Sequence, residues 1–135
     1  ANINPEWVHE ARDRLTETHI RCNIEGFVTI DYRRELITEN VDFLGRFGYE
    51  TRGLWHMVER KENGDLAEWG MGGPFVNYTF YDDDSRRLYM IDGMVFAPGY
   101  DKREFLRHME TIAHTFRSEN DVLAAMSEAE GMPTE

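Results

Sequence analysis

The sequence contains five histidines and a single cysteine, the side chains with the widest range of chemistry. His19 and Cys22 are three residues apart, a spacing that brings two side chains to one face of a helix, and imidazole and thiolate are common zinc ligands. A zinc site needs further ligands, and the local sequence supplies none. His108 and His114 are six residues apart, so they belong to different helix faces. We therefore expect no metal and no cofactor.

Two other candidate reactive groups lack the residues that their chemistry needs. The run Asp82-Asp83-Asp84 has neither the glycine nor the terminal glutamate of a calcium loop, so it predicts an exposed hairpin turn. A nucleophilic Cys22 would need a base and a positively charged setting, and the charges around it are mixed. We assign no catalytic residue, and the sequence favours a protein without enzymatic activity.

Glu50, Arg52 and Asp92 form the most interesting charged set, because all three lie within predicted strands. If these strands are neighbours, the three side chains can meet as an arginine–carboxylate cluster on the sheet. Such a cluster either clamps an anionic substrate or serves as a structural pair or partner contact. The sequence leaves both interpretations open.

The stretch Trp69–Phe75, WGMGGPF, has three glycines and a proline within seven residues. It is not a phosphate loop, because it lacks Gly-Lys-Ser/Thr and is followed by a predicted strand rather than a helix. We expect Gly72 and Gly73 to allow unusual φ values or close backbone approach, and Pro74 to fix φ at the start of the strand. Gly53 has the same structural role.

A ligand pocket beside this stretch is the alternative interpretation. Trp55, Trp69 and Phe75 would wall the pocket, and Arg52 would anchor an anion. This arrangement corresponds to a small-ligand-binding protein or a hydrolase-like enzyme.

The elements that must position these residues follow from periodicity. Residues 5–20 predict an amphipathic helix with Trp7, Ala11 and Leu15 in one stripe. Strands are predicted at 27–32, 47–57, 75–81 and 87–97, and 33–46 is a long connection with a short extended piece at 41–43. A second helix carries Phe105, Met109, Ile112 and Phe116, and a weaker tail helix spans 122–129.

This order predicts an α+β fold, a four-stranded antiparallel meander with both flanking helices on one face and a short C-terminal tail helix. Residues 1–117 form a single domain, and 118–135 an acidic, partly helical tail. The last two strands are apolar on both sides, so a sheet face remains that the two helices cannot cover. The residues of the predicted interface are Val76, Tyr78, Phe80, Tyr89, Ile91 and Val95.

Composition narrows the possible partners. The formal net charge is −11, and the tail beyond residue 117 has no lysine or arginine, so the chain repels nucleic acid and anionic lipid. The sequence has no long apolar run and no signal peptide. It begins with alanine, and we expect it to be a piece of a longer protein.

Several motifs together resemble a known family. They are Glu50–Trp55 (ETRGLW), Met71–Val76 (MGGPFV), Asp92–Pro98 (DGMVFAP), Lys102-Arg103, and Arg12-Asp13 in the first helix. The stretch 11–117 resembles the C-terminal part of an uncharacterised family of Bacteroidetes lipoproteins, a domain of unknown function. Met94 and Phe96 depart from its pattern, and Cys22 lacks the apolar segment that precedes a lipidated cysteine.

The resemblance implies a location in the cell envelope, in the periplasm or attached to the outer membrane. It implies contact with the membrane only through a lipid anchor that this chain lacks. No activity comes with the resemblance. The function expected from residues and family together is a binding or assembly module, whose partner is the missing N-terminal region of the same protein or a homo-oligomer.

Overall fold

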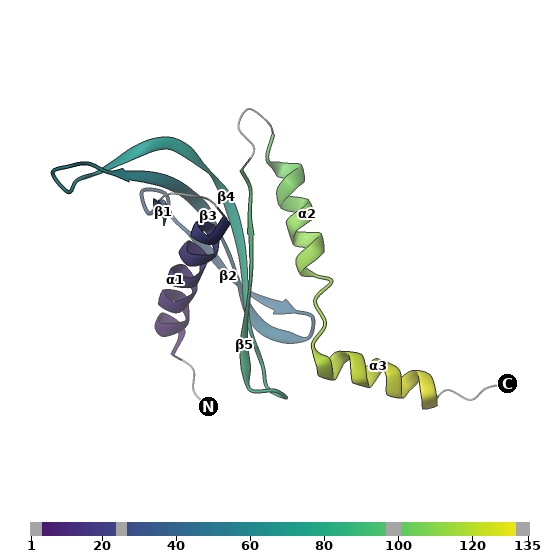
Figure 1. Cartoon of the computed structure of the whole chain (residues 1–135). Helices are drawn as coiled ribbons and strands as arrows, with labels where there is room; N and C mark the ends of the chain where they lie inside the picture. Colours follow the sequence, from purple (N-terminus) through teal and green to yellow (C-terminus); the bar gives the residue numbers. More distant parts are fainter. Residues whose placement is uncertain (1–3, 24–26, 97–100, 132–135) are drawn as a thin grey trace.

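The computed structural model describes residues 4–23, 27–96 and 101–131, with the side chains of all of these except 20–23, 27, 60 and 66–71. Three helices and five strands follow along the chain (Figure 1). They are α1 (Pro5–Asn23), β1 (Phe27–Ile30), β2 (Ile37–Phe43), β3 (Arg46–Arg60), β4 (Leu66–Asp82), β5 (Arg87–Met94), α2 (Arg103–Ala113) and α3 (Glu119–Gly131). None of the described helices is both long and apolar enough to cross a bilayer.

The strands form one antiparallel sheet in the order β1-β3-β4-β5. The prediction of an α+β fold with a meander, flanking helices and a tail helix is confirmed. The sheet has one strand more than expected, because β2 occupies the segment predicted as a connection. β1 pairs only with residues 55–58 of β3, so the earlier part of that long strand has a free edge, with which β2 pairs.

Helices α1 and α2 lie on opposite faces of the sheet, as Figure 1 shows. Arg12 and Thr16 of α1 bond to Thr51 and Asp92, whereas α2 packs over the alternate residues of the same strands, such as Tyr78. The expectation that both helices share one face is wrong in this detail. Because both faces are apolar, each one requires its own helix.

The predicted sheet interface is therefore covered within the chain itself. Val76, Tyr78 and Phe80 are each at most 2% exposed and form a core with Phe43 and Ala113 beneath α2. Of the remaining predicted interface residues, Tyr89 and Ile91 pack against this core, and Val95, just beyond the end of β5, is 5% exposed. The open face inferred from the sequence is thus not open.

The glycines of MGGPF lie within β4, not at a corner before it, since the strand begins at Leu66. Gly72 and Gly73 pair with His56 and Trp55 on β3. A Cβ on Gly72 would lie 2.5 Å from the carbonyl oxygen of Trp55, and one on Gly73 would collide with the carbonyl oxygen of Val95. Close backbone approach, and not a positive φ, is what these positions require.

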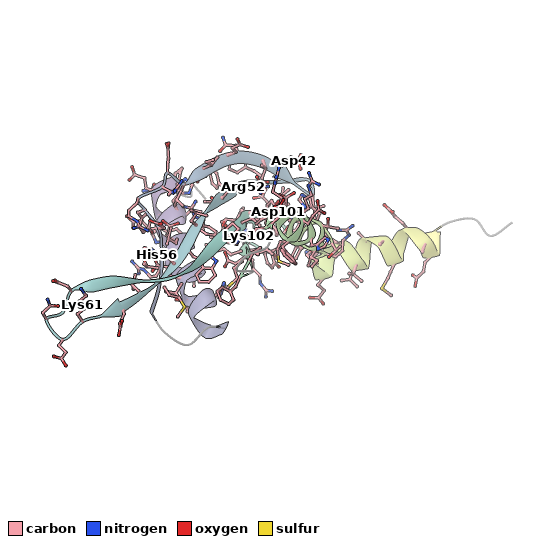
Figure 2. The ribbon with its side chains drawn as sticks, turned by 90° about the horizontal axis from the view of Figure 1, so that it is seen from above. Asp42, Arg52, His56, Lys61, Asp101 and Lys102 are labelled. Atoms are coloured by element: carbon pink, nitrogen blue, oxygen red, sulfur yellow. The ribbon has the colours of Figure 1, made fainter. Side chains whose placement is uncertain are left out.

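The tail helix α3 is fixed to the sheet at its first turn. Ser118 and Asp121 cap it reciprocally: the amide of Asp121 donates to Ser118 Oγ (3.1 Å), and the amide of Ser118 donates to Asp121 Oδ2 (2.8 Å). Arg46 of β3 donates to Asp121 Oδ1 at 2.8 Å and to Asp82 Oδ1 at 3.1 Å. The rest of α3 projects away from the body (Figures 1 and 2).

Replacing Gly73 tests the close approach of the strands. Gly73→Ala should destabilise the protein by about 3 kcal/mol or more, because its methyl group overlaps a backbone carbonyl that cannot turn aside. Gly131→Ala is the matched control, since a Cβ at Gly131 meets nothing within 4 Å. Urea unfolding of both variants measures the difference, and equal stabilities would contradict the assignment.

Acid should release α3 from the sheet. Hydrogen bonds from Ser85 and Arg46 lower the pKa of Asp82, and those from Ser118 and Arg46 lower the pKa of Asp121, below the ordinary 3.8. Both carboxylates stabilise the attachment above that value, and the stabilisation disappears as the pH falls through the lowered pKa. We expect the amide resonances of α3 to move toward random-coil positions below about pH 4.

Asp121→Asn should produce this release at neutral pH. Glu128→Gln is the control, because Glu128 is exposed and lies beyond the anchored turn. An α3 that stays attached in Asp121→Asn would show that the ion pair is not the anchor.

Candidate functional site

The interface between α1 and the sheet is polar, contrary to the predicted stripe. Val8, Arg12 and Thr16 point inward and are at most 3% exposed, whereas Trp7 is 60% and Leu15 43% exposed. The apolar stripe predicted to face the core therefore lies on an exposed flank of the helix. The inward residues recur at the same spacing of four, but two of the three are polar.

Arg12 is the first centre of this interface. Its guanidinium donates to Thr51 Oγ1 on β3 at 2.8 Å and to Asp13 Oδ1 at 2.7 Å. Burial and the neighbouring Arg12 lower the pKa of His9, so a neutral ring accepts from Arg12 through Nδ1 at 2.9 Å. A buried charge is tolerated here because each side of the guanidinium has a partner.

Asp92 of β5 is the second centre. Its Oδ1 accepts from Thr16 Oγ1 at 2.7 Å and from Asn77 Nδ2 at 2.5 Å, while His19 Nδ1 lies 2.5 Å from its Oδ2. Asn77 Oδ1 in turn accepts from Thr79 Oγ1 at 2.6 Å. The carboxylate is 7% exposed and the His19 ring 50%, so this network leads from the core to the surface.

Within the part of the chain that the structure describes, this network shows the orienting half of a catalytic arrangement. A buried carboxylate that holds a half-exposed imidazole is the geometry of a positioned base. The hydroxyl of Thr16 donates to Asp92. Among the described residues, the network ties α1 to β4 and β5.

Arg52 lies on the other face of the sheet, within a carboxylate pair. It donates to Glu50 Oε1 at 2.8 Å and to Glu110 Oε1 of α2 at 2.5 Å. Figure 2 shows Arg52 on the sheet. Its guanidinium therefore joins α2 to β3 and is neutralised where an anion would bind.

Glu50, Arg52 and Asp92 do not form one cluster. Glu50 and Arg52 are paired in register with Tyr78 and Val76, on the α2 face, while Asp92 lies under α1. Of the two interpretations that the sequence left open, Glu50 and Arg52 fit the structural pair. Asp92 belongs instead to the polar network under α1.

The ligand pocket expected around Arg52 does not form from these residues. Trp55 and Phe75 are at most 2% exposed in the core on the α1 side, opposite to Arg52. Alternation along β3 requires this separation, since Arg52 and Trp55 are three residues apart. The side chain of Trp69 lies outside the described residues. Gly53 packs against Leu36 and Phe75, with which a Cβ would collide.

The described residues contain no group of three metal-ligating side chains. His114 Nδ1 bonds to the carbonyl of Glu110 at 2.6 Å, and the side chain of Cys22 lies outside the described part. Asp83 and Asp84 are exposed in the β4–β5 turn, while Asp82 pairs with Arg46.

Sequence reasoning missed Arg12, Thr16, His19 and Asn77 as members of one site. The available signal was the spacing of Val8, Arg12 and Thr16, which matches an inward helix face as well as the apolar stripe does. Nothing local pairs that face with Asp92, which is 76 residues away from Thr16.

Removing the carboxylate of Asp92 should cost stability. Asp92→Ala leaves Thr16 and Asn77 as buried donors without an acceptor, and we expect a loss of about 2–3 kcal/mol in unfolding free energy. Asp83→Ala, in the exposed turn, should change it by less than about 0.5 kcal/mol. Chemical denaturation compares the two, and equal losses would contradict the central role of Asp92.

Comparison with known proteins places the chain in a family. No curated protein and no solved structure matches it. A family described as "Domain of unknown function (DUF4837)" matches residues 1–115, which include α1, the whole sheet and α2. The match extends over most of the chain and ends before α3. The chain belongs to this DUF4837 family.

Proposed function

We propose that this domain is a non-enzymatic assembly module that binds its partner along strand β5. The observation that carries the proposal is the position of β5 at the end of the strand order, with no described strand on its outer side. An eight-residue edge offers a row of backbone donors and acceptors to a further strand. The interface is thus the edge of the sheet and not its face.

The flank of α1 next to this edge is apolar. Asp13 and Glu17 reach Tyr32 and Thr29 on the β1 side. A helix turns by about 100° per residue, so the Trp7–Leu15 stripe lies on the opposite flank, toward β5, which α1 contacts. This stripe is exposed in the chain as it stands.

The flank of α2 next to β5 is also apolar. Phe116 packs on Tyr89 of β5, with ring centroids 5.1 Å apart, and Met109 lies against Gly93. On α2, Phe105 is four residues before Met109 and Ile112 is three residues after it, so both share the flank of Met109. They are 40% and 61% exposed. Both layers that cover the sheet therefore end in apolar side chains at the same edge.

A second copy of the chain fits this edge. Two β5 strands paired antiparallel about a two-fold axis join the sheets into one and keep each face on its own side. The Leu15 flanks then meet each other on one face, and the Ile112 flanks meet on the other. Each apolar group finds its own counterpart, as an isologous contact requires.

The other occupant of this edge is a preceding part of the same polypeptide. The resemblance to Bacteroidetes lipoproteins supports this occupant. The same resemblance supports a location in the cell envelope, held there by a lipid anchor. In either case the domain acts by holding chains together. Arg52, Trp55 and Phe75 lend no support to the small-ligand or hydrolase-like alternative, because they do not share a cavity.

Light scattering during size exclusion tests the self-assembly. At about 100 µM protein we expect a mass of twice 15.9 kDa. Ile112→Lys should return the protein to a monomer, because it places a charge in the contact. Ile37→Lys is the matched control, since Ile37 is 58% exposed but lies on β2, away from β5. A monomeric unmodified chain, or equal effects of the two substitutions, would defeat self-assembly along β5.

A further inference from the structure

The Asn63-Gly64 pair lies at the tip of a ribbon that projects from the body. Among the described strands, β1 pairs with β3 only as far as Val58, and β5 pairs with β4 only from Phe75 onward. From Val58 to the tip, β3 and β4 therefore pair with each other alone in the described part of the sheet. Figure 2 shows Lys61 at the far end of this ribbon. A two-stranded ribbon by itself is marginally stable in water, so the tip can open while the body stays folded.

An asparagine that precedes glycine can modify itself without an enzyme. The backbone nitrogen of the glycine attacks the side-chain carbonyl carbon, the Cγ–Nδ2 bond breaks, and ammonia leaves with the proton that the backbone nitrogen gives up. Water then opens the resulting five-membered imide and yields aspartate or isoaspartate. Glycine has no side chain to shield its nitrogen, and Asn63 is the only asparagine of the sequence that glycine follows.

The closed tip occupies both of the groups that must react. The amide of Gly64 donates to the carbonyl oxygen of Lys61 at 2.9 Å, so the attacking nitrogen is held. Asn63 Oδ1 accepts from the amide of Asp65 at 3.0 Å, and Asn63 Nδ2 donates to the Asp65 carboxylate at 3.1 Å. The amide of Lys61 closes the loop on the carbonyl of Asp65 at 2.8 Å, and Gly64 has a φ of +87°, as a three-residue hairpin loop requires.

We propose that Asn63 is a site of spontaneous deamidation, and that local opening of the ribbon tip, rather than unfolding of the domain, controls its rate. Opening frees the Gly64 amide and the Asn63 side chain while the rest of the sheet stays paired. The product has a carboxylate in place of the amide, and isoaspartate also adds one carbon to the main chain, so the original turn cannot form again. The site is separate from the β5 edge and does not depend on the function proposed for it.

Peptide mapping by mass spectrometry measures the reaction through the mass difference between amide and acid. In the native protein at mildly alkaline pH, we expect Asn63 to convert about tenfold faster than Asn40 or more. Asn40 is the internal control, because it is also exposed but precedes valine, whose branched side chain shields the backbone nitrogen. An Asn63 that stays unchanged in the native protein, over a time in which the urea-unfolded protein converts, would overturn the proposal.

Three substitutions identify the opening that controls the rate. Asp65→Ala removes the carboxylate that holds Asn63 Nδ2 and should raise the native rate about fivefold. Glu62→Ala is the matched control, because Glu62 is exposed in the same turn and takes no part in the hydrogen bonds that hold Asn63. Asp92→Ala weakens the body and should change the rate less than about twofold.

The rate of each variant in urea corrects for any effect of the substitution on the chemistry itself. Equal corrected rates in Asp65→Ala and Glu62→Ala would show that the tip contacts do not protect Asn63. A rate that rises in Asp92→Ala as strongly as the stability falls would show that the whole domain must unfold first. Either result would overturn the proposal.

Discussion

The burial of the sheet on both of its faces is the constraint on which the rest of the structure depends. β4 places Phe75 in one core and Val76, Tyr78 and Phe80 in the other, so neither face can be left in water. One helix covers each face, and charged groups fix each helix to the sheet. Arg12 and Asp92 are buried beneath α1, whereas the pair of Glu110 on α2 with Arg52 is half-buried. Among the described strands, β5 has no strand on its outer side.

The polar inner side of α1 has a consequence for assembly. Because Arg12 and Thr16 occupy the inward face, the apolar residues of this helix point to its flank. If the apolar stripe of α1 faced the sheet, as in most amphipathic helices, it would not be exposed beside β5. Hydrogen bonds fix the position of a helix on a sheet more specifically than apolar contacts do. They therefore hold α1 in one orientation, in which its apolar flank stays exposed.

The sequence was sufficient for the class, the meander and the approximate helices, since these follow from local periodicity. It was not sufficient for the faces, because α1 carries two stripes at the same spacing and only partners distant in sequence, such as Asp92 for Thr16, choose between them. β2 was missed because its turn uses Leu44 and Gly45, both at positive φ, without the usual Asn-Gly. The prediction of a pocket around Arg52 and Trp55 was wrong for a simpler reason. The two residues are three apart on one strand, so their side chains point to opposite faces of the sheet.

The β5 side of the domain and the tail helix α3 differ in charge. The β5 side presents the exposed, uncharged side chains of Leu15, Phe105 and Ile112. The α3 end is rich in carboxylates, and two such ends repel at short range within a Debye length of about 10 Å. The pairing proposed along β5 therefore joins uncharged flanks rather than the carboxylate-rich tail helices.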